Sequence, residues 1–240
     1  DCQPQTVDVI KTRAEPMGLE VIVGDEYKDI KGEIVCGIIQ YPGTLGDIKD
    51  PSEAISQIHK SKGKAVLICD LLSLAKLKTP AELGADIAVG SSQRFGIPMG
   101  YGGPHAAFFA TKDEYKRSMP GRIIGVSVDR HGKKAYRLAL QTREQHIRRD
   151  KATSNICTAQ ALLAIVSAAY AVYHGPEGIL KIANNTSQLA KNFSDKLKQT
   201  GYELYSEHFF DTVTIKTLDK TDSIYNLSLI HISEPTRLST

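Results

Sequence analysis

The sequence has few cysteines, no long apolar run and little net charge, and each shortage excludes a class of protein. Its four cysteines form no CxxC pair, which argues against a zinc site or a disulfide scaffold and favours reducing surroundings. No apolar run reaches the roughly 18 residues that a membrane-spanning helix needs. The 30 basic and 27 acidic side chains leave a formal net charge of +3. We therefore expect neither nucleic acid nor a membrane as the main partner.

The 240 residues, 41% of them apolar, suffice for one large domain and the start of a second. Apolar runs of strand length alternate with helical patterns. We expect helices over 7–14 and from Pro51, after an N-cap at Asp50, to Gly63. The run Ala65–Cys69 is apolar throughout, which is typical of a central strand covered on both faces. The expected strands are 19–23, 34–39, 65–69, 86–89 and 106–110. This alternation predicts an α/β fold with a mostly parallel sheet.

After this region the pattern changes. Two apolar stretches, 122–126 and 135–140, flank the turn Asp129–Gly132 and predict a hairpin. A long apolar helix over 158–173 and a second helix over about 177–199 follow, separated by His174-Gly175-Pro176, and then strands at 202–205 and 211–217. We divide the chain into a large domain (1–173), the beginning of a small domain (174–225) and a tail (226–240). The tail fits no element of this architecture, and we interpret it as non-native sequence. Because no initiator methionine precedes Asp1, we expect the chain to be part of a longer protein.

The first candidate for chemistry is Asp70, which follows the expected central strand 65–69. In an open parallel sheet, ligands bind beyond the carboxyl ends of the strands. A carboxylate there could accept a hydrogen bond from a protonated cofactor ring, or it could simply cap a helix starting near Leu71. The polar run Gly90–Gly96 begins twenty residues later and has Gln93 in it.

Two loops could bind anions. The glycine-rich segment Ile97–His105 could form an anion nest or a tight turn between strands, and its His105 could be a general base or structural. The segment 141–158 has four cations within nine positions, followed by possible N-caps at Ser154 and Asn155. It could bind an anion at the helix N-terminus, or it could be a solvated basic loop with an ordinary cap.

Five blocks of the sequence carry a resemblance to a known family, namely Gly90–Ala110, Ser118–Ser127, Leu138–Gln160, Tyr173–Gly175 and Phe209–Thr212. They resemble the P-protein family of the glycine cleavage system. The resemblance covers about Asp1 to Lys216 and lies within the amino-terminal half of that family's long chain.

The resemblance implies an α/β fold of the pyridoxal-phosphate (PLP) transferase fold type I. Its large domain has a mostly parallel central sheet with helices on both faces, and a small α+β domain begins after it. It implies an oxidoreductase, glycine dehydrogenase (decarboxylating), in which PLP delocalises the carbanion left when glycine loses carbon dioxide. The aminomethyl group then passes to the lipoyl arm of H-protein. Further implied partners are glycine and the carboxyl-terminal half of the enzyme, in a dimer or heterotetramer.

The resemblance also assigns roles to residues. Gln93 stands at the position of the Schiff-base lysine, and an amide cannot form an imine, so no catalytic residue is expected in this chain. Asp70 matches the aspartate that pairs with the ring nitrogen, in a vestigial role. Thr153, Ser154 and Asn155 stand where a loop reaches across the interface to the cofactor phosphate of the partner half. This half is then a scaffold that completes its partner's site.

Two alternatives stay open at this point. The chain could be a ligand-free interaction or regulatory domain with a PLP-type fold. It could also be a self-contained PLP transferase that uses another lysine, of which Lys112 and Lys151 are nearest the candidate loops. The expected location is the cytoplasm of a bacterium or the mitochondrial matrix of a eukaryote. No metal site is expected.

Overall fold

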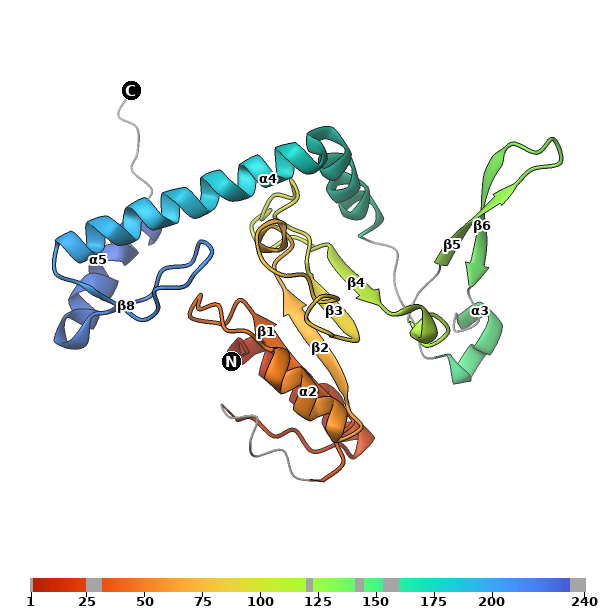
Figure 1. Cartoon of the computed structure of the whole chain (residues 1–240), viewed down its shortest axis with the longest axis horizontal. Coiled ribbons are helices and arrows are strands. Elements are labelled where there is room, and N and C mark those ends of the chain that lie inside the picture. Colours follow the sequence, from red (N-terminus) through yellow and green to blue (C-terminus); the bar gives the residue numbers. More distant parts are fainter. Residues whose placement is uncertain (1, 25–31, 120–122, 141–144, 153–159, 234–240) are drawn as a thin grey trace.

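The central sheet has four strands in the order β1-β2-β3-β4. The computed structural model describes residues 2–24, 32–119, 123–140, 145–152 and 160–233. The strands are β1 (Cys36–Tyr41), β2 (Lys64–Cys69), β3 (Ile87–Ser91) and β4 (Ala107–Thr111). The first three run parallel, and β4 is antiparallel to β3. The predicted mostly parallel sheet is thus confirmed, and Figure 1 shows it at the centre of the molecule.

The connection between β1 and β2 is the amphipathic helix α2 (Ser52–Lys60). Its buried Ile55 and Ile58 pack on the sheet residues Ile39 and Leu67 to form the main core. The expected cap differs slightly. Pro51 occupies the N-cap position, and Asp50, one residue earlier, accepts a hydrogen bond from the Ser52 amide at 2.9 Å.

The predicted strand at 19–23 is wrong. The chain begins with α1 (Pro4–Ala14) and the 3-10 turn η1 (Glu15–Met17), and residues 19–23 then continue without strand pairing. Ile22 and Val23 are exposed. A strand needs a neighbour that accepts and donates backbone hydrogen bonds, and no strand among the described residues pairs with this segment.

The predicted hairpin is confirmed as β5 (Ile123–Val128) and β6 (Lys134–Leu140), which pair antiparallel. Asp129 Oδ1 fixes the turn because it accepts hydrogen bonds from the amides of His131 and Lys133, at 2.7 and 2.9 Å. The hairpin projects away from the central sheet (Figure 1). The short helices α3 (Gln145–Arg148) and η5 (Arg149–Lys151) follow it.

The two predicted long helices form one element, α4 (Ala161–Gln199), broken at Gly175. Gly175 has φ 62° and ψ 179°, outside the helical region, and Pro176 follows it. The predicted stop is therefore a local break, after which the helix resumes. Among the described residues, no helix combines the length and the apolar character needed to span a bilayer.

The predicted strands after α4 are much shorter, namely β7 (Glu203–Leu204) and β8 (Ile215–Lys216). The turn η6 (Leu218–Lys220) and the helix α5 (Thr221–Ser233) follow. The prediction that residues 226–240 fit no element is thus wrong for residues 226–233, which complete α5. The non-native origin of the tail stays a prediction.

A second, smaller core joins α4 to the carboxyl edge of the sheet. Leu72, in the turn before η3 (Ser73–Ala75), is buried against Ala183 of α4 and Phe210. Another contact comes from the Ile48 amide, which donates to the His208 carbonyl at 2.9 Å. The second half of α4 and the segment after it thus pack directly on loops of the sheet.

Candidate functional site

The carboxyl ends of β2 and β3 place Asp70 beside the loop that carries Arg94. The side chain of Asp70 is only 21% exposed. Its Oδ1 accepts a hydrogen bond from the Leu72 amide at 3.1 Å. This bond closes a local turn ahead of η3, whose N-cap is Leu72 and not Asp70, so the predicted helix cap near Leu71 is not found. Asp70 Oδ2 accepts a hydrogen bond from Arg94 Nη1 at 3.0 Å. The second carboxylate oxygen therefore already has a cationic partner within this chain.

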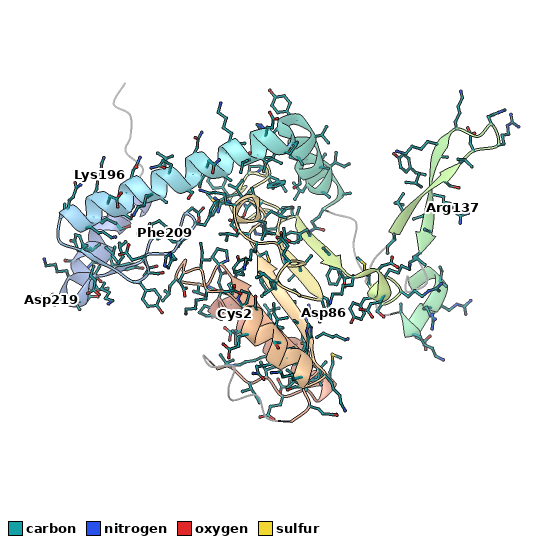
Figure 2. All side chains as sticks on the ribbon, in the orientation of Figure 1. Cys2, Asp86, Arg137, Lys196, Phe209 and Asp219 are labelled. Carbon is teal, nitrogen blue, oxygen red and sulfur yellow. The ribbon has the colours of Figure 1, made fainter. Side chains whose placement is uncertain are left out.

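Arg94 also holds a second carboxylate. Its Nη2 lies 2.5 Å from Oδ2 of Asp211, which is likewise largely buried. The guanidinium carbon lies 5.7 Å from the centre of the Phe210 ring, within cation–π distance. One side chain thus ties the end of β3 both to the end of β2 and to the segment 209–212. Figure 2 labels Phe209 of this segment, between α4 and the sheet.

The electrostatics of the edge favour neutral or paired groups. Burial raises the pKa of Asp70 above its usual value and outweighs the opposing effect of the Arg94 cation; the nearby Asp211 carboxylate raises it further. Burial, with a smaller contribution from the Asp70 charge, raises the pKa of the adjacent Cys69 to about 12. Cys69 is therefore a protonated thiol at neutral pH and cannot serve as a thiolate nucleophile.

Gln93 precedes Arg94 in the sequence and begins a turn. Its backbone amide donates a hydrogen bond to Ser91 Oγ at 3.1 Å, and its backbone carbonyl accepts one from the Ile97 amide at 3.1 Å. The adjacent Ser92 is buried, and its side chain lies 3.1 Å from Ser167 Oγ of α4. The backbone on both sides of Gln93 is thus fixed by hydrogen bonds.

Aromatic side chains hold the same loop under α4. The rings of Phe95 and Tyr170 lie 5.5 Å apart, and Tyr170 also contacts His174, with ring centres 4.3 Å apart. Gly96 has φ +79°, and a Cβ there would lie 2.9 Å from the Tyr170 ring. Only a glycine allows both this backbone conformation and the approach of the ring. The loop 92–96 is therefore a packed surface of the fold.

The glycine-rich segment 97–105 lies in the connection between the antiparallel strands β3 and β4, and it is largely exposed apart from the buried Ile97. Gly100, Tyr101 and Gly102 all have positive φ, and the Gly103 amide donates to the Gly100 carbonyl at 3.0 Å. A tight turn is thus present at residues 100–103, but it lies within a longer connection between Ser91 and Ala107, and the anion nest stays a prediction. His105 is exposed on this connection.

The predicted phosphate-binding residues Thr153, Ser154 and Asn155 lie outside the described residues. The basic residues before them, Arg148, Arg149 and Lys151, lie in α3 and η5 and are exposed. The predicted role of this loop therefore stays a prediction.

A charged cluster that the sequence analysis did not single out lies at the opposite, amino end of β3. Asp86 is buried, and its carboxylate accepts from Lys112 Nζ at 2.6 Å, from the Ala65 amide at 2.9 Å and from His59 Nε2 at 2.8 Å. Lys112 is thus engaged at the edge of the sheet away from Asp70, which argues against it as a cofactor lysine. No group of three or more potential metal ligands occurs in the described part of the chain.

Burial of Asp86 disfavours its ionised form, but the hydrogen bonds from Lys112, the Ala65 amide and His59 outweigh that effect and lower its pKa to about 2. The sequence analysis missed both the Asp86 cluster and the ion pairs of Arg94, and one pattern could have indicated them. Asp86 directly precedes β3 and Arg94 follows it, so both charged residues stand near the ends of a strand inside the sheet.

Comparison with known proteins gives one consistent family. The family model described as "Glycine cleavage system P-protein" matches residues 1–231, which is further than Lys216, the end expected from the sequence. The glycine dehydrogenase (decarboxylating) of Pelagibacter ubique is 87% identical over 229 residues, which cover 95% of this chain and 24% of that protein. The corresponding protein of Cereibacter sphaeroides is 56% identical over 216 residues. The chain spans about a quarter of the length of the curated relatives it matches.

Solved structures agree. An inhibitor-bound glycine decarboxylase (P-protein) of the glycine cleavage system has a TM-score of 0.78 and 35% identity, and the match covers 87% of this chain and 50% of that chain. A cysteine desulfurase from Thermococcus onnurineus has a TM-score of 0.54 and 19% identity, over 92% of this chain and 57% of that chain. This second likeness concerns the α/β fold alone.

Proposed function

The chain belongs to the glycine cleavage system P-protein family, and on that basis we propose that it is a non-catalytic part of a longer glycine decarboxylase. In the complete enzyme, PLP supplies the electron sink that allows glycine to lose carbon dioxide. The aminomethyl group then passes to the lipoyl arm of H-protein. The part described here contributes a scaffold and one wall of the site, and the lysine that binds PLP belongs to the carboxyl-terminal half.

The observation that carries this proposal is the ion pair between Asp70 and Arg94. In a PLP site, a carboxylate at this position accepts a hydrogen bond from the protonated ring nitrogen. Here the same carboxylate accepts its bonds from Arg94 and from the Leu72 amide. Gln93 offers an amide, which cannot form an imine with an aldehyde. These residues do not fit PLP, and we assign no chemical step to them.

What these residues do instead is hold the edge of the sheet in a fixed shape. Arg94 connects two carboxylates from distant segments, and the Ser92–Ser167 contact secures the loop to α4. A surface with such internal connections is suited to support a neighbouring site, because residues that wall a site must keep their positions.

We assign residues 1–173 to the large domain of PLP transferase fold type I and residues 174–225 to the start of the small domain. The α/β sheet with three parallel strands supports the first assignment. The break of α4 at Gly175 supports the boundary between them. We further assign Thr153, Ser154 and Asn155 to the phosphate of the cofactor in the partner half.

The test uses a full-length chimera in which this sequence replaces the matching quarter of the Pelagibacter ubique relative. The chimera is incubated with PLP, reduced with borohydride and mapped by peptide mass spectrometry. We expect one pyridoxyl-lysine, outside this segment, and no label without borohydride. Specific labelling of a lysine in this segment, such as Lys112 or Lys151, would overturn the proposal. Absence of any specific label in the whole chimera would favour a ligand-free interaction domain.

A further inference from the structure

The hairpin of β5 and β6 has two chemically different faces. One face carries large apolar side chains in directly opposed pairs, with Ile124 opposite Leu138 and Val126 opposite Tyr136. Val128 extends the same face toward the turn, because residues two apart in a strand lie on one side. The other face carries the small residues Gly125, Ser127 and Ala135 together with Arg137, and Ile123 at the end away from the turn. The hairpin is therefore amphipathic.

The large apolar face is bare. The exposed fractions are 58% for Ile124, 68% for Val126, 67% for Val128, 67% for Tyr136 and 46% for Leu138. The small-residue face is half-buried at Ile123, Gly125 and Ser127. Isolated apolar residues at a surface are ordinary, but a contiguous apolar face of this kind is typical of an interaction site.

The hairpin also has little support of its own. An isolated two-stranded hairpin is at best marginally stable in water, and it gains stability when one face packs against another element. Within the described part of the chain, no other element packs extensively against β5 or β6. Figure 1 shows the hairpin standing away from the sheet, and Figure 2 shows Arg137 on it, well apart from Asp86 in the sheet.

Basic side chains lie at the turn end of the apolar face. Arg130 and Lys133 lie in or beside the turn and are exposed. Lys134 lies opposite Val128 at the turn end of the apolar face, with its Nζ 5.4 Å from the centre of the Tyr136 ring. The one acid of the turn, Asp129, already accepts two backbone hydrogen bonds. An occupant of this face therefore needs an apolar centre and carboxylates near the hairpin turn, because opposite charges at the rim orient such contacts.

We propose that the apolar face of the hairpin docks on the remaining part of the same full-length polypeptide. The relatives are about four times as long as this chain, since it covers only 24% and 23% of their length. Most of the surface of a full-length relative, which could cover the apolar face, thus belongs to sequence that this chain does not match. This inference rests on the proposed function, in which the chain is part of a longer enzyme, and it names the surface through which the two parts meet.

The test is site-specific photo-cross-linking in the full-length chimera. Tyr136→p-benzoylphenylalanine places a photoreactive benzophenone on the apolar face and keeps an aromatic side chain there, although a larger one. The matched control, Arg137→p-benzoylphenylalanine, places the same group one residue later in β6, on the opposite face. We expect Tyr136→p-benzoylphenylalanine to cross-link within one polypeptide to peptides outside this segment, at least fivefold more than the control.

Three results would overturn the proposal: equal cross-linking from both positions, cross-links confined to residues of this segment, or cross-links to a second copy, recognised by doubled mass on a denaturing gel.

Should the photoreactive variants fail to accumulate, hydrogen exchange of Val126→Glu and Ser127→Glu chimeras gives a second measurement. We expect exchange of the β5 amides to rise at least tenfold in Val126→Glu and less than threefold in Ser127→Glu. Equal changes would overturn the proposal. Neither readout needs bound PLP. The docking proposal can therefore fail while the lysine labelling supports the proposed function, and the proposed function can fail while the docking proposal holds.

Discussion

Arg94 Nη1 lies 3.0 Å from Asp70 Oδ2, so the carboxylate that follows β2 is paired with the guanidinium that follows β3. The same guanidinium reaches Asp211 from the segment after α4. This relationship gives the edge of the sheet its shape and gives Asp70 a partner that is not a cofactor. It also makes Arg94 the most informative residue to change.

We predict that Arg94→Gln in the full-length chimera loosens this edge, because it leaves Asp70 and Asp211 largely buried without a cation. Leaving a buried polar or charged group without its partner lowers the stability by about 1–3 kcal/mol. The measurement is the opening free energy of the β2 and β3 amides by hydrogen exchange. The control is Lys62→Gln, whose ion pair with Glu33 is 80% exposed on both sides and is worth about 0–1 kcal/mol. Equal effects of the two substitutions would contradict the assigned role of Arg94.

We predict that Gly90→Ala separates β2 from β3. A Cβ at Gly90 would lie 2.1 Å from the Cys69 carbonyl oxygen and 2.6 Å from the Phe108 ring. Because backbone cannot move aside cheaply, we expect a loss of about 1–3 kcal/mol in the same hydrogen-exchange measurement. Gly24→Ala is the matched control, since a Cβ there meets nothing within 4 Å, and it should change stability by less than about 0.5 kcal/mol. A silent Gly90→Ala would show that the two strands are not so closely spaced.

We predict an acid-sensitive contribution from Asp86. Its folded-state pKa of about 2 lies below the ordinary aspartate value of 3.8, so the ionised form is favoured in the folded protein. The resulting stabilisation, on the order of 2 kcal/mol, is fully present above about pH 4 and is lost as the pH falls toward 2. Asp86→Asn should therefore lower the melting temperature at pH 6, and the difference from the unsubstituted chimera should shrink between pH 4 and pH 2.5. A difference that stays constant over this range would count against the ionised cluster.

We predict that Thr153→Ala combined with Ser154→Ala weakens PLP binding by the full-length chimera. A lost hydrogen bond to a charged acceptor costs about 1.5–3 kcal/mol, so the affinity should fall at least about tenfold. The measurement is the dissociation constant for PLP by equilibrium dialysis, together with the melting temperature without PLP. If these residues only cap a helix, stability should fall by about 1 kcal/mol and PLP affinity should stay the same.

The sequence by itself determined the features that depend on neighbours along the chain. The apolar run of β2, the turn at Asp129 and the break at Gly175 all follow from local residue types, and each is found where it was expected. The substitution of an amide for an amine at Gln93 is also chemistry that sequence alone provides.

Only the tertiary structure decided which partners those features have. The apolar segment 19–23 pairs with no strand among the described residues, because strand formation depends on a neighbour and not on composition alone. From its position in the sequence alone, Asp70 could cap a helix or face a cofactor. Its second oxygen pairs with Arg94 because parallel strands bring their carboxyl ends to one edge. Arg94 in turn reaches Asp211 because α4 crosses that edge and returns the chain to it, a distance in sequence over which no local pattern carries information.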